Sequence, residues 1–357
     1  MRDHSPGMPV PFVYNPGMAD YDFGKHPFRA ANVSDLREYL QAHIDTGEII
    51  EVPSEPATDD MLLTVHSPDY IEKVLRLEKN SGHLSMDTWV APGTPDAAKA
   101  VVGGAVAAVD LALDGSEVVL CTGGFHHAGV DYGEGFCIYN DVAIAARHAL
   151  DSGVSRVMII DTDAHQGNGT MDIFYRSKDV LFLSLHQHPR TLYPGRGFAY
   201  ETGDGEGKGF TVNVPMFPFS RDPDYRSAFE RVVGPVVEQF DPDLIIRNGG
   251  ADPHYRDQLT ALGMSMDGFR WMGGAIRGMA KGVDAPLVDL PISGYGDHAV
   301  PGWLQIWSGA TGADLTVPYD EGAYDEHPRF PVDLVTAENA DILDEVAENL
   351  KGRWDLL

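Results

Sequence analysis

Three side chains of metal-ligating types follow two apolar segments of the chain. Asp163 and His165 lie two residues apart in IIDTDAHQGNGT (159–170), and Asp252 follows DLIIRNGG (243–250). Side chains two residues apart on an extended segment point the same way, and a ligand from a second segment can complete a site. Taken singly, Asp163 suits a helix cap and His165 a buried structural histidine. Together, two carboxylates and one imidazole without a thiolate predict Zn²⁺, with Fe²⁺ or Co²⁺ as alternatives, and an open position for activating water.

A tandem pair, His126 and His127, follows the segment VVLCTGGF (118–125). Two adjacent histidines are more often structural, but here they could act as a general base and a general acid. Each imidazole then needs a partner at its other ring nitrogen, and Asp161 and Asn168 are candidates. A carboxylate partner would raise the pKa of one histidine, whereas an amide would not, so the pair would split into two different proton carriers.

A tyrosine, Tyr295, is flanked by glycines in ISGYGDH (292–298). It can be an ordinary turn residue, or its hydroxyl can donate a hydrogen bond to a developing oxyanion. His298 is a weaker candidate for that role.

The elements that must position these residues alternate between apolar strands and helices. Strands are expected at 118–121, 156–161, 180–186, 209–215, 243–250 and 286–294. Polar residues gather at the ends of these strands. Helices are expected after an N-cap at Ser34, after Thr94-Pro95, at 141–150, at 224–240 with an internal Gly-Pro break, and at 341–350. Continuous apolar strands separated by helices predict an α/β fold with a mainly parallel sheet covered on both faces. Ligands bind such sheets outside the carboxyl ends of the strands, so the polar loops should converge there.

The net charge of the chain limits the classes of binding partner that are expected. The 357 residues include 26 Lys+Arg against 54 Asp+Glu, a net charge of −28, which disfavours nucleic-acid binding. A solvated acidic surface explains this charge, and attraction of cationic substrates such as polyamines or lysine-rich tails is the alternative. No apolar run approaches the ~20 residues of a membrane span. The two cysteines, Cys121 and Cys137, fit a reducing compartment, and we expect a cytoplasmic protein.

The motifs resemble those of a known superfamily over roughly residues 14 to 310. In order, they are HSPDYIEKV, APGTPDAAKAVVGGAV, GGFHHAG, GFCIYND, DTDAHQGNGT, FLSLHQ, YPGRG, TGDGEGKGFTVNVP, GGADPHYRDQLTALGMS and GYG. They are similar to the histone deacetylase, acetoin-utilisation deacetylase and acetylpolyamine amidohydrolase superfamily. The resemblance implies an arginase/deacetylase-like three-layer αβα fold. It also implies one catalytic domain over 1–357, with a C-terminal extension (311–357) packed on the core.

The resemblance also assigns roles. It makes Asp163, His165 and Asp252 the zinc ligands, and it assigns catalytic positions to His126, His127, Tyr295, Asp161 and Asn168. Gly135 and Phe136 would line an acyl-lysine tunnel, with Tyr193 as the opposite wall. A structural K⁺ site is implied at Asp161, Asp163, His165, Ser184 and Leu185. Arg29 resembles an arginine beneath the site, near the acetate exit.

Some residues depart from the family pattern. Asn168 stands where eukaryotic class I enzymes have Asp, which points to the class II-like, bacterial or archaeal branches. PISGYG replaces a glycine-rich run before Tyr295. His254 and Asp257 are expected to structure the loop after Asp252, and Asp257 could instead favour a cationic substrate.

We therefore expect zinc-dependent hydrolysis of N-acetyl or N-acyl amides of primary amines, such as acetyl-lysine in proteins or acetylpolyamine, with release of acetate. The alternatives are a two-metal ureohydrolase of the arginase type and a non-catalytic acyl-lysine or polyamine-binding module. Substrate identity, acyl length, native metal and oligomeric state stay open, although segments 14–28 and 187–207 could lie at the rim or in a homo-oligomer interface.

Overall fold

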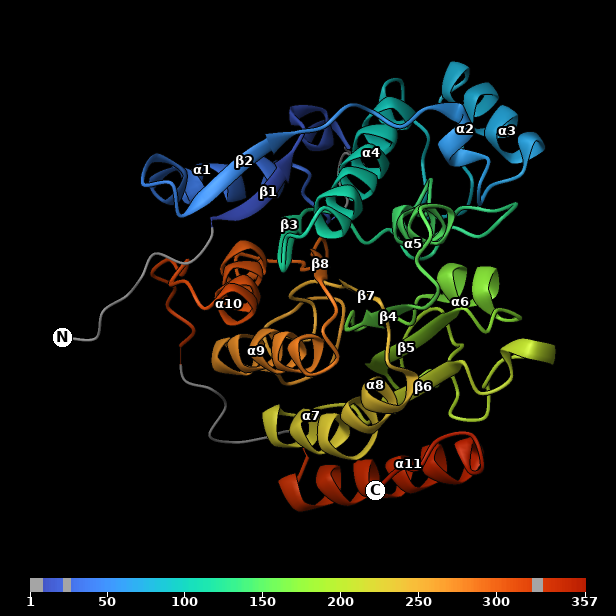
Figure 1. The fold of residues 1–357 in the computed structure, drawn as a ribbon, viewed down its shortest axis with the longest axis vertical. Coiled ribbons are helices and arrows are strands. Elements are labelled where there is room, and N and C mark those ends of the chain that lie inside the picture. The colour runs from blue at the N-terminus through green and yellow to red at the C-terminus, as the bar shows by residue number, and fades with distance from the viewer. Residues whose placement is uncertain (1–8, 22–26, 323–329) are drawn as a thin grey trace.

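Eight parallel strands form one sheet in a computed structural model that describes residues 9–21, 27–322 and 330–357 (Figure 1). Their order across the sheet is β2-β1-β3-β8-β7-β4-β5-β6. Their bounds are β1 Val10–Tyr14, β2 Ile49–Pro53, β3 Val118–Cys121, β4 Val157–Asp161, β5 Val180–Gln187, β6 Thr211–Met216, β7 Leu244–Asn248 and β8 Leu287–Leu290. The expected α/β class with a parallel sheet is confirmed.

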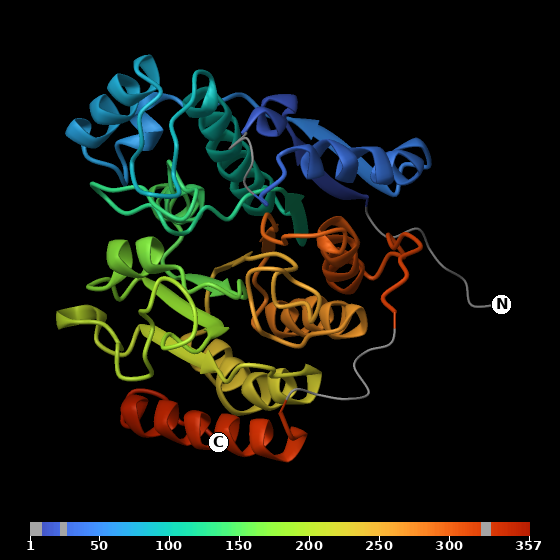
Figure 2. The same cartoon turned by 180° about the vertical axis from the view of Figure 1, so that it is seen from behind.

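Helices cover both faces of the sheet and complete the three-layer αβα arrangement (Figures 1 and 2). The α-helices are α1 Ala31–Asp45, α2 Asp59–Leu62, α3 Pro68–Lys79, α4 Thr94–Leu113, α5 Asp141–Asp151, α6 Asn168–Phe174, α7 Asp222–Ala228, α8 Gly234–Phe240, α9 Met266–Gly282, α10 Ala299–Thr311 and α11 Val332–Leu350. Short 3-10 turns occur at Pro16–Asp20 and Gly205–Gly207. Within the described ranges, no helix combines the length and apolar character needed to cross a membrane.

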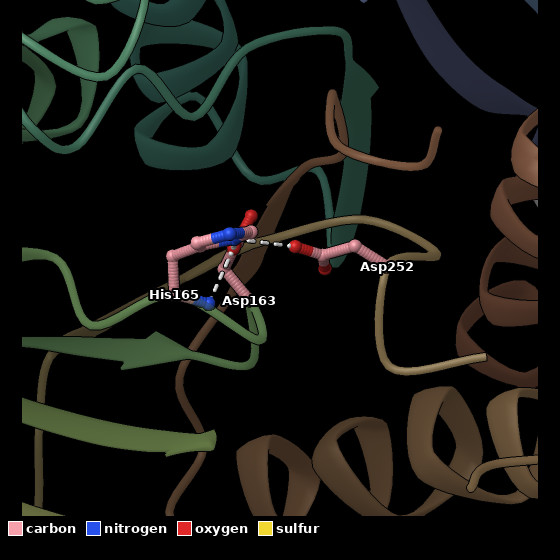
Figure 3. A group of neighbouring side chains, drawn as sticks. All are labelled: Asp163, His165 and Asp252. Carbon is pink, nitrogen blue, oxygen red and sulfur yellow. Dashed lines mark hydrogen bonds and ion pairs between the residues drawn. The ribbon is translucent and has the colours of Figure 1, made fainter. Parts of the chain in front are cut away.

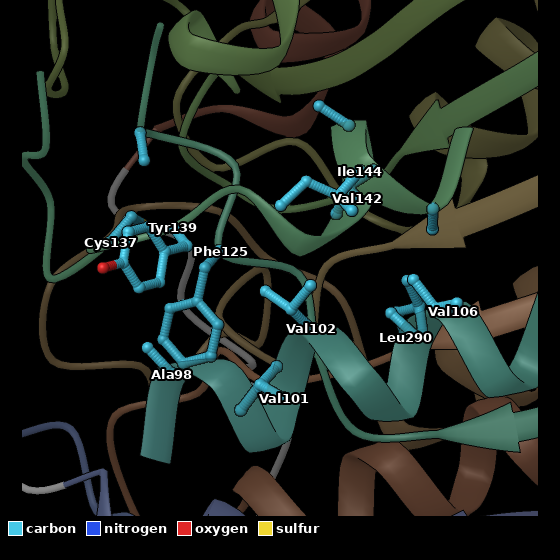
Figure 4. Close-up of a cluster of buried hydrophobic side chains, with 14 of the residues drawn as sticks. Ala98, Val101, Val102, Val106, Phe125, Cys137, Tyr139, Val142, Ile144 and Leu290 are labelled. Carbon is cyan, nitrogen blue, oxygen red and sulfur yellow. The ribbon is translucent and has the colours of Figure 1, made fainter. Parts of the chain in front are cut away.

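Successive side chains along each strand point to opposite faces of the sheet, so the hydrophobic core has two parts. In β4, Val157 and Ile159 pack with α4 and α5, whereas Met158 and Ile160 pack on the opposite face with α9 and α10. Because both faces are buried, the strand reads as a continuous apolar run. Figure 4 shows the first of these cores, where side chains of α4 meet those of α5 and the loop before it.

Two expected helix starts differ from the structure. Helix α1 begins at Ala31 without a side-chain cap, so Ser34 lies inside the helix rather than at its N-cap. Helix α4 begins at Thr94 itself, and Gly93, at φ 85°, is the N-cap. The chain between 222 and 240 stays helical because a single π-helical turn at Phe229–Val233 joins α7 to α8 across the Gly-Pro pair.

The C-terminal helix packs on the far edge of the sheet. α11 lies beside β6 and α7 (Figure 2), and Leu343, Val346 and Leu350 are buried in the second core. Asn339 ties it to the body of the chain through a 2.9 Å bond from the Phe217 N–H to its Oδ1.

Candidate active site

The predicted site residues meet at the carboxyl ends of four neighbouring strands, β3, β8, β7 and β4. His126 and His127 follow β3, Tyr295 follows β8 and Asp252 follows β7, while Asp163 follows β4. This is the edge where ligands bind parallel sheets. The expected convergence is therefore present in the structure.

The three proposed metal ligands face one another in a buried group (Figure 3). Their ligand atoms all lie within 4.8 Å of one another. His165 Nδ1 is 3.1 Å from Asp163 Oδ1 and 2.9 Å from Asp252 Oδ2. Gly249, at φ 112°, makes this approach feasible, because a Cβ there would lie 2.4 Å from the Asp163 backbone nitrogen. Strands β4 and β7 can therefore bring their loops together.

The donor set fits a divalent cation. Asp252 Oδ1 accepts hydrogen bonds from Ser293 Oγ at 2.9 Å and from the Ala164 N–H at 3.1 Å, so Oδ2 is left to face the site. Burial, followed by the neighbouring Asp163 charge, raises the pKa of Asp252 well above its usual range. A positive charge between two buried carboxylates this close stabilises both of them, and a divalent cation supplies it when His165 is neutral. Nitrogen and oxygen donors without thiolate suit zinc with an open position.

The tandem histidines have different partners. His126 Nδ1 lies 2.8 Å from Asp161 Oδ2, and His127 Nδ1 lies 2.7 Å from Asn168 Oδ1. Their Nε2 atoms are 3.2 Å apart. Burial alone would lower the pKa of His126, but the carboxylate of Asp161 and that of Asp163 outweigh it and raise the pKa to about 9. Burial, and then the charge of His126, hold the pKa of His127 well below 6.5. The two environments thus favour an imidazolium at His126 and a neutral imidazole at His127.

Tyr295 lies across the site from the histidines. The residue is 5% exposed, and its ring lies 6.1 Å from the His165 ring. Its backbone N–H donates to Asp257 Oδ2 at 2.8 Å, and the same oxygen lies 3.1 Å from His298 Nε2. Burial, followed by the charge of Asp163, raises the pKa of Tyr295 well above 10, so the phenol stays protonated and can donate. His298 is turned toward Asp257 rather than into the cavity.

A small cavity of about 20 Å³ leads to these groups. The expected tunnel residues Gly135 and Phe136 line it, together with Phe28. A Cβ on Gly135, at φ 55°, would lie 2.3 Å from the His127 ring, so the wall must be glycine here. Tyr193, the expected opposite wall, is not among the residues that line this cavity; it is 40% exposed, with its ring 5.1 Å from that of His127.

Other expected positions are also located. Asp161, at the end of β4, is level with Ser184 of β5 in the sheet register, and Leu185 follows it. These residues of the expected K⁺ site are buried on adjacent strands. Arg29 is exposed to solvent, and its neighbour Phe28 lines the cavity.

Two acidic residues near the site were not predicted. Asp141 is buried, and its carboxylate accepts 2.8 Å bonds from the N–H groups of Gly124 and Phe125, which fixes the loop before the histidines. Its position after GFCIYN was visible in the sequence, but its partners were not. Glu134 directly precedes Gly135 and accepts a 2.7 Å bond from the side-chain amide of Asn168.

Comparisons with known proteins agree with this geometry. The family profile described as "Histone deacetylase domain" matches residues 26–308. The "Acetoin utilization protein AcuC" of Staphylococcus aureus (strain MRSA252) is 37% identical over 272 residues, which are 71% of this chain and 69% of that protein. A "Probable deacetylase" of Archaeoglobus fulgidus is 34% identical over 303 residues, 82% of this chain and 83% of that protein.

A solved structure gives the same result for the fold. The "Crystal Structure of HDA15 HD domain" matches with a TM-score of 0.83 at 25% identity, over 96% of this chain and 95% of that one. The chain belongs to the histone deacetylase family and is an enzyme of the deacetylase type.

Proposed function

We propose that this protein is a zinc-dependent amidohydrolase that removes the acetyl group from an N-acetylated primary amine and releases acetate. The observation that carries the proposal is a pair of adjacent histidines, one bonded to a carboxylate and the other to an amide, beside a buried Asp-His-Asp group. His126 is held charged by Asp161, and His127 is held neutral by burial and by the His126 charge. Hydrolysis of an amide needs one proton acceptor and one proton donor, and this pair provides both.

The proposed reaction starts at His127. An ion bound by Asp163, His165 and Asp252 would polarise the amide carbonyl and acidify the attacking water. His127 Nδ1 is bonded to Asn168 Oδ1, so its Nε2 is the atom that accepts the proton of that water. The Tyr295 hydroxyl donates a hydrogen bond to the carbonyl oxygen as negative charge develops there.

The leaving amine takes its proton from His126. Asp161 stabilises the imidazolium through Nδ1, so Nε2–H is the proton donor. The C–N bond breaks as the nitrogen is protonated, and the products are acetate and a primary amine. The proton that His127 took from water passes to His126, since their Nε2 atoms lie 3.2 Å apart, and this restores the pair. The proton left on the carboxylic acid passes to the amine, which leaves as an ammonium ion.

Cavity size and chain charge bear on the substrate. A space of about 20 Å³ is close to the ~10–15 Å³ that one water requires. This favours acetyl over longer acyl groups. The net charge of −28 favours cationic substrates, namely acetyl-lysine in proteins or acetylpolyamine. The segment Gln166-Gly167-Asn168 adds no carboxylate to the ligand group, which gives no support to a two-metal ureohydrolase.

Several other expectations remain part of the proposal. They are K⁺ bound at Asp161, Asp163, His165, Ser184 and Leu185; one catalytic domain with its core at 14–310; a cytoplasmic location; and a possible homo-oligomer. The structure describes only part of 14–28, so the expectation for that segment is limited to its described residues.

The test is a substrate panel on the full chain reconstituted with Zn²⁺, Fe²⁺ or Co²⁺. Acetyl-lysine peptide, acetylputrescine, acetylspermidine and longer acyl-lysines are assayed for acetate or free amine. We expect turnover of at least one acetyl substrate, slower turnover of longer acyl groups, and none in Asp163→Ala, which should also lose the metal. Tight binding of these compounds without turnover under every metal would favour the non-catalytic binding module instead.

A further inference from the structure

A carboxylate next to the cavity-lining Gly135 is connected to one of the histidines through an amide. Glu134 is half-buried directly before Gly135, and its Oε1 accepts a 2.7 Å bond from Asn168 Nδ2. The other end of the same amide, Oδ1, lies 2.7 Å from His127 Nδ1. Glu134, Asn168 and His127 therefore form a continuous hydrogen-bonded chain from the surface to the site.

The chemistry of the neighbours determines which end of the amide faces His127. A carboxylate accepts hydrogen bonds and cannot donate, so the NH₂ end of Asn168 must face Glu134. The Tyr132 hydroxyl acts in the same direction. It donates to Asp172 Oδ2 at 2.7 Å, and its oxygen lies 3.4 Å from Asn168 Nδ2, where it accepts. Two neighbours thus require a donor, and the carbonyl end is left for His127.

This orientation selects the tautomer of His127. Because Asn168 Oδ1 can only accept, His127 must carry its proton on Nδ1, and Nε2 keeps its lone pair. If the amide turned over, its NH₂ group would face Nδ1 and the proton would move to Nε2. That tautomer cannot accept a proton from water at the atom that faces the cavity. A carboxylate at position 168 would present an acceptor in either orientation and would need no such control.

We propose that Glu134 is a positioning residue that holds the Asn168 amide in one orientation and thereby fixes His127 as the Nδ1–H tautomer. The catalytic consequence rests on the proposed function, in which His127 accepts the proton of water. The tautomer itself does not depend on any reaction. Glu134 also lies close to Tyr193, whose phenol has a pKa raised by burial and then by the Glu134 charge.

A second role for Glu134, attraction of a cationic substrate, can be separated from the first. Glu134→Gln removes the charge and keeps a side-chain carbonyl that accepts from Asn168 Nδ2. Glu134→Ala removes both. Asp131→Asn is the matched control, since Asp131 is an exposed acid of the same loop and is not bonded to Asn168.

The experiment measures the tautomer and the kinetics of the same variants. The ¹⁵N chemical shifts of ¹⁵N-histidine-labelled protein distinguish Nδ1–H from Nε2–H, and His127→Gln identifies the resonance among the 14 histidines. We expect Nδ1–H for His127 in the parent, Glu134→Gln and Asp131→Asn, both metal-free and with Zn²⁺. Glu134→Ala should show a mixture or the Nε2–H form. Its kcat should fall about 10- to 100-fold, the scale of one hydrogen bond to a charged group, with KM little changed.

A second background tests the orientation directly. With Asn168→Asp the amide is gone, so adding Glu134→Ala should cause no further loss of kcat. An unchanged His127 tautomer in Glu134→Ala, or equal losses in Glu134→Ala and Glu134→Gln, would overturn the inference. If instead the tautomer changes as expected and no variant, including the parent, hydrolyses any acetyl substrate, the inference stands and the proposed function fails.

Discussion

Replacing Asp257 should disable Tyr295 without touching the metal ligands. The Asp257 side chain is 0% exposed, and its Oδ2 accepts from the Tyr295 N–H at 2.8 Å and lies 3.1 Å from His298 Nε2. Asp257→Ala leaves two buried N–H groups without this acceptor. Each unsatisfied donor costs about 1–3 kcal/mol, so the free energy of unfolding should fall by roughly 2–6 kcal/mol. Asp257→Asn can keep an oxygen at the Oδ2 position, where both bonds are made, and turns its NH₂ group toward the Leu259 N–H that bonds Oδ1, so it should lose less stability than Asp257→Ala.

The catalytic effect should be larger than the stability loss alone explains. If Asp257 presents Tyr295, kcat of Asp257→Ala should fall toward that of Tyr295→Phe, a loss of about 10²- to 10³-fold. Zinc content should be unchanged. Urea unfolding, metal analysis and kcat are measured for both single variants and for the double variant.

The double variant, Asp257→Ala with Tyr295→Phe, tests whether Asp257 acts on kcat through Tyr295. Once the Tyr295 hydroxyl is gone, Asp257→Ala should cost little further kcat while keeping its full stability penalty. If the two losses of kcat multiplied instead, Asp257 would act independently of Tyr295 and the assignment would be wrong.

Three further predictions concern the same site. Tyr295→Phe should keep its fold and its zinc, since the ring packing is retained, and should lose about 10²-fold or more in kcat; a parent-like rate would contradict the oxyanion role. Burial lowers the pKa of His126, but the Asp161 carboxylate raises it to about 9. Asp161→Asn removes that carboxylate, so His126 should lose its proton at a lower pH than in the parent, and the alkaline limb of the kcat profile should move to lower pH. Metal affinity should weaken about tenfold for each pH unit as the pH falls through neutrality. Burial lowers the pKa of His165, but the neighbouring Asp163 and Asp252 raise it to about 10, so a proton must leave His165 before the ion binds. A chelator competition series that shows no pH dependence would contradict this.

The metal-ligand group could be predicted because it depends on local rules. Asp163 and His165 share a side of an extended segment, and Asp252 ends a strand of the same sheet, so strand period and sheet polarity place them together. The split between His126 and His127 followed from the chemistry of a carboxylate and an amide partner. The same rules located the continuous apolar strands in the middle of the sheet.

Contacts that depend on loop conformation could not be predicted in this way. Glu134 reaches Asn168 because Gly135 and Phe136 take positive φ angles of 55° and 65°, which no pattern in the sequence requires. The strands β2 and β1, which lie at one end of the sheet, were not predicted because proline and exposed residues interrupt their pattern, as at Ile50, which is 49% exposed. Ser34 was misread as a cap because α1 begins earlier, with no side-chain cap of its own.

The strand order has a consequence for how the chain is made. β3 and β4 follow one another along the sequence, yet β8 and β7 lie between them in the sheet. A chain still emerging from the ribosome therefore has two separate strand groups, which stay unjoined until residues 287–290 have been synthesised. The histidines belong to one group and Asp163, His165 and Asp252 to the other. A nascent chain that ends before β8 can therefore bring the three metal ligands together but cannot place the tandem histidines beside them, so the complete site forms late in folding.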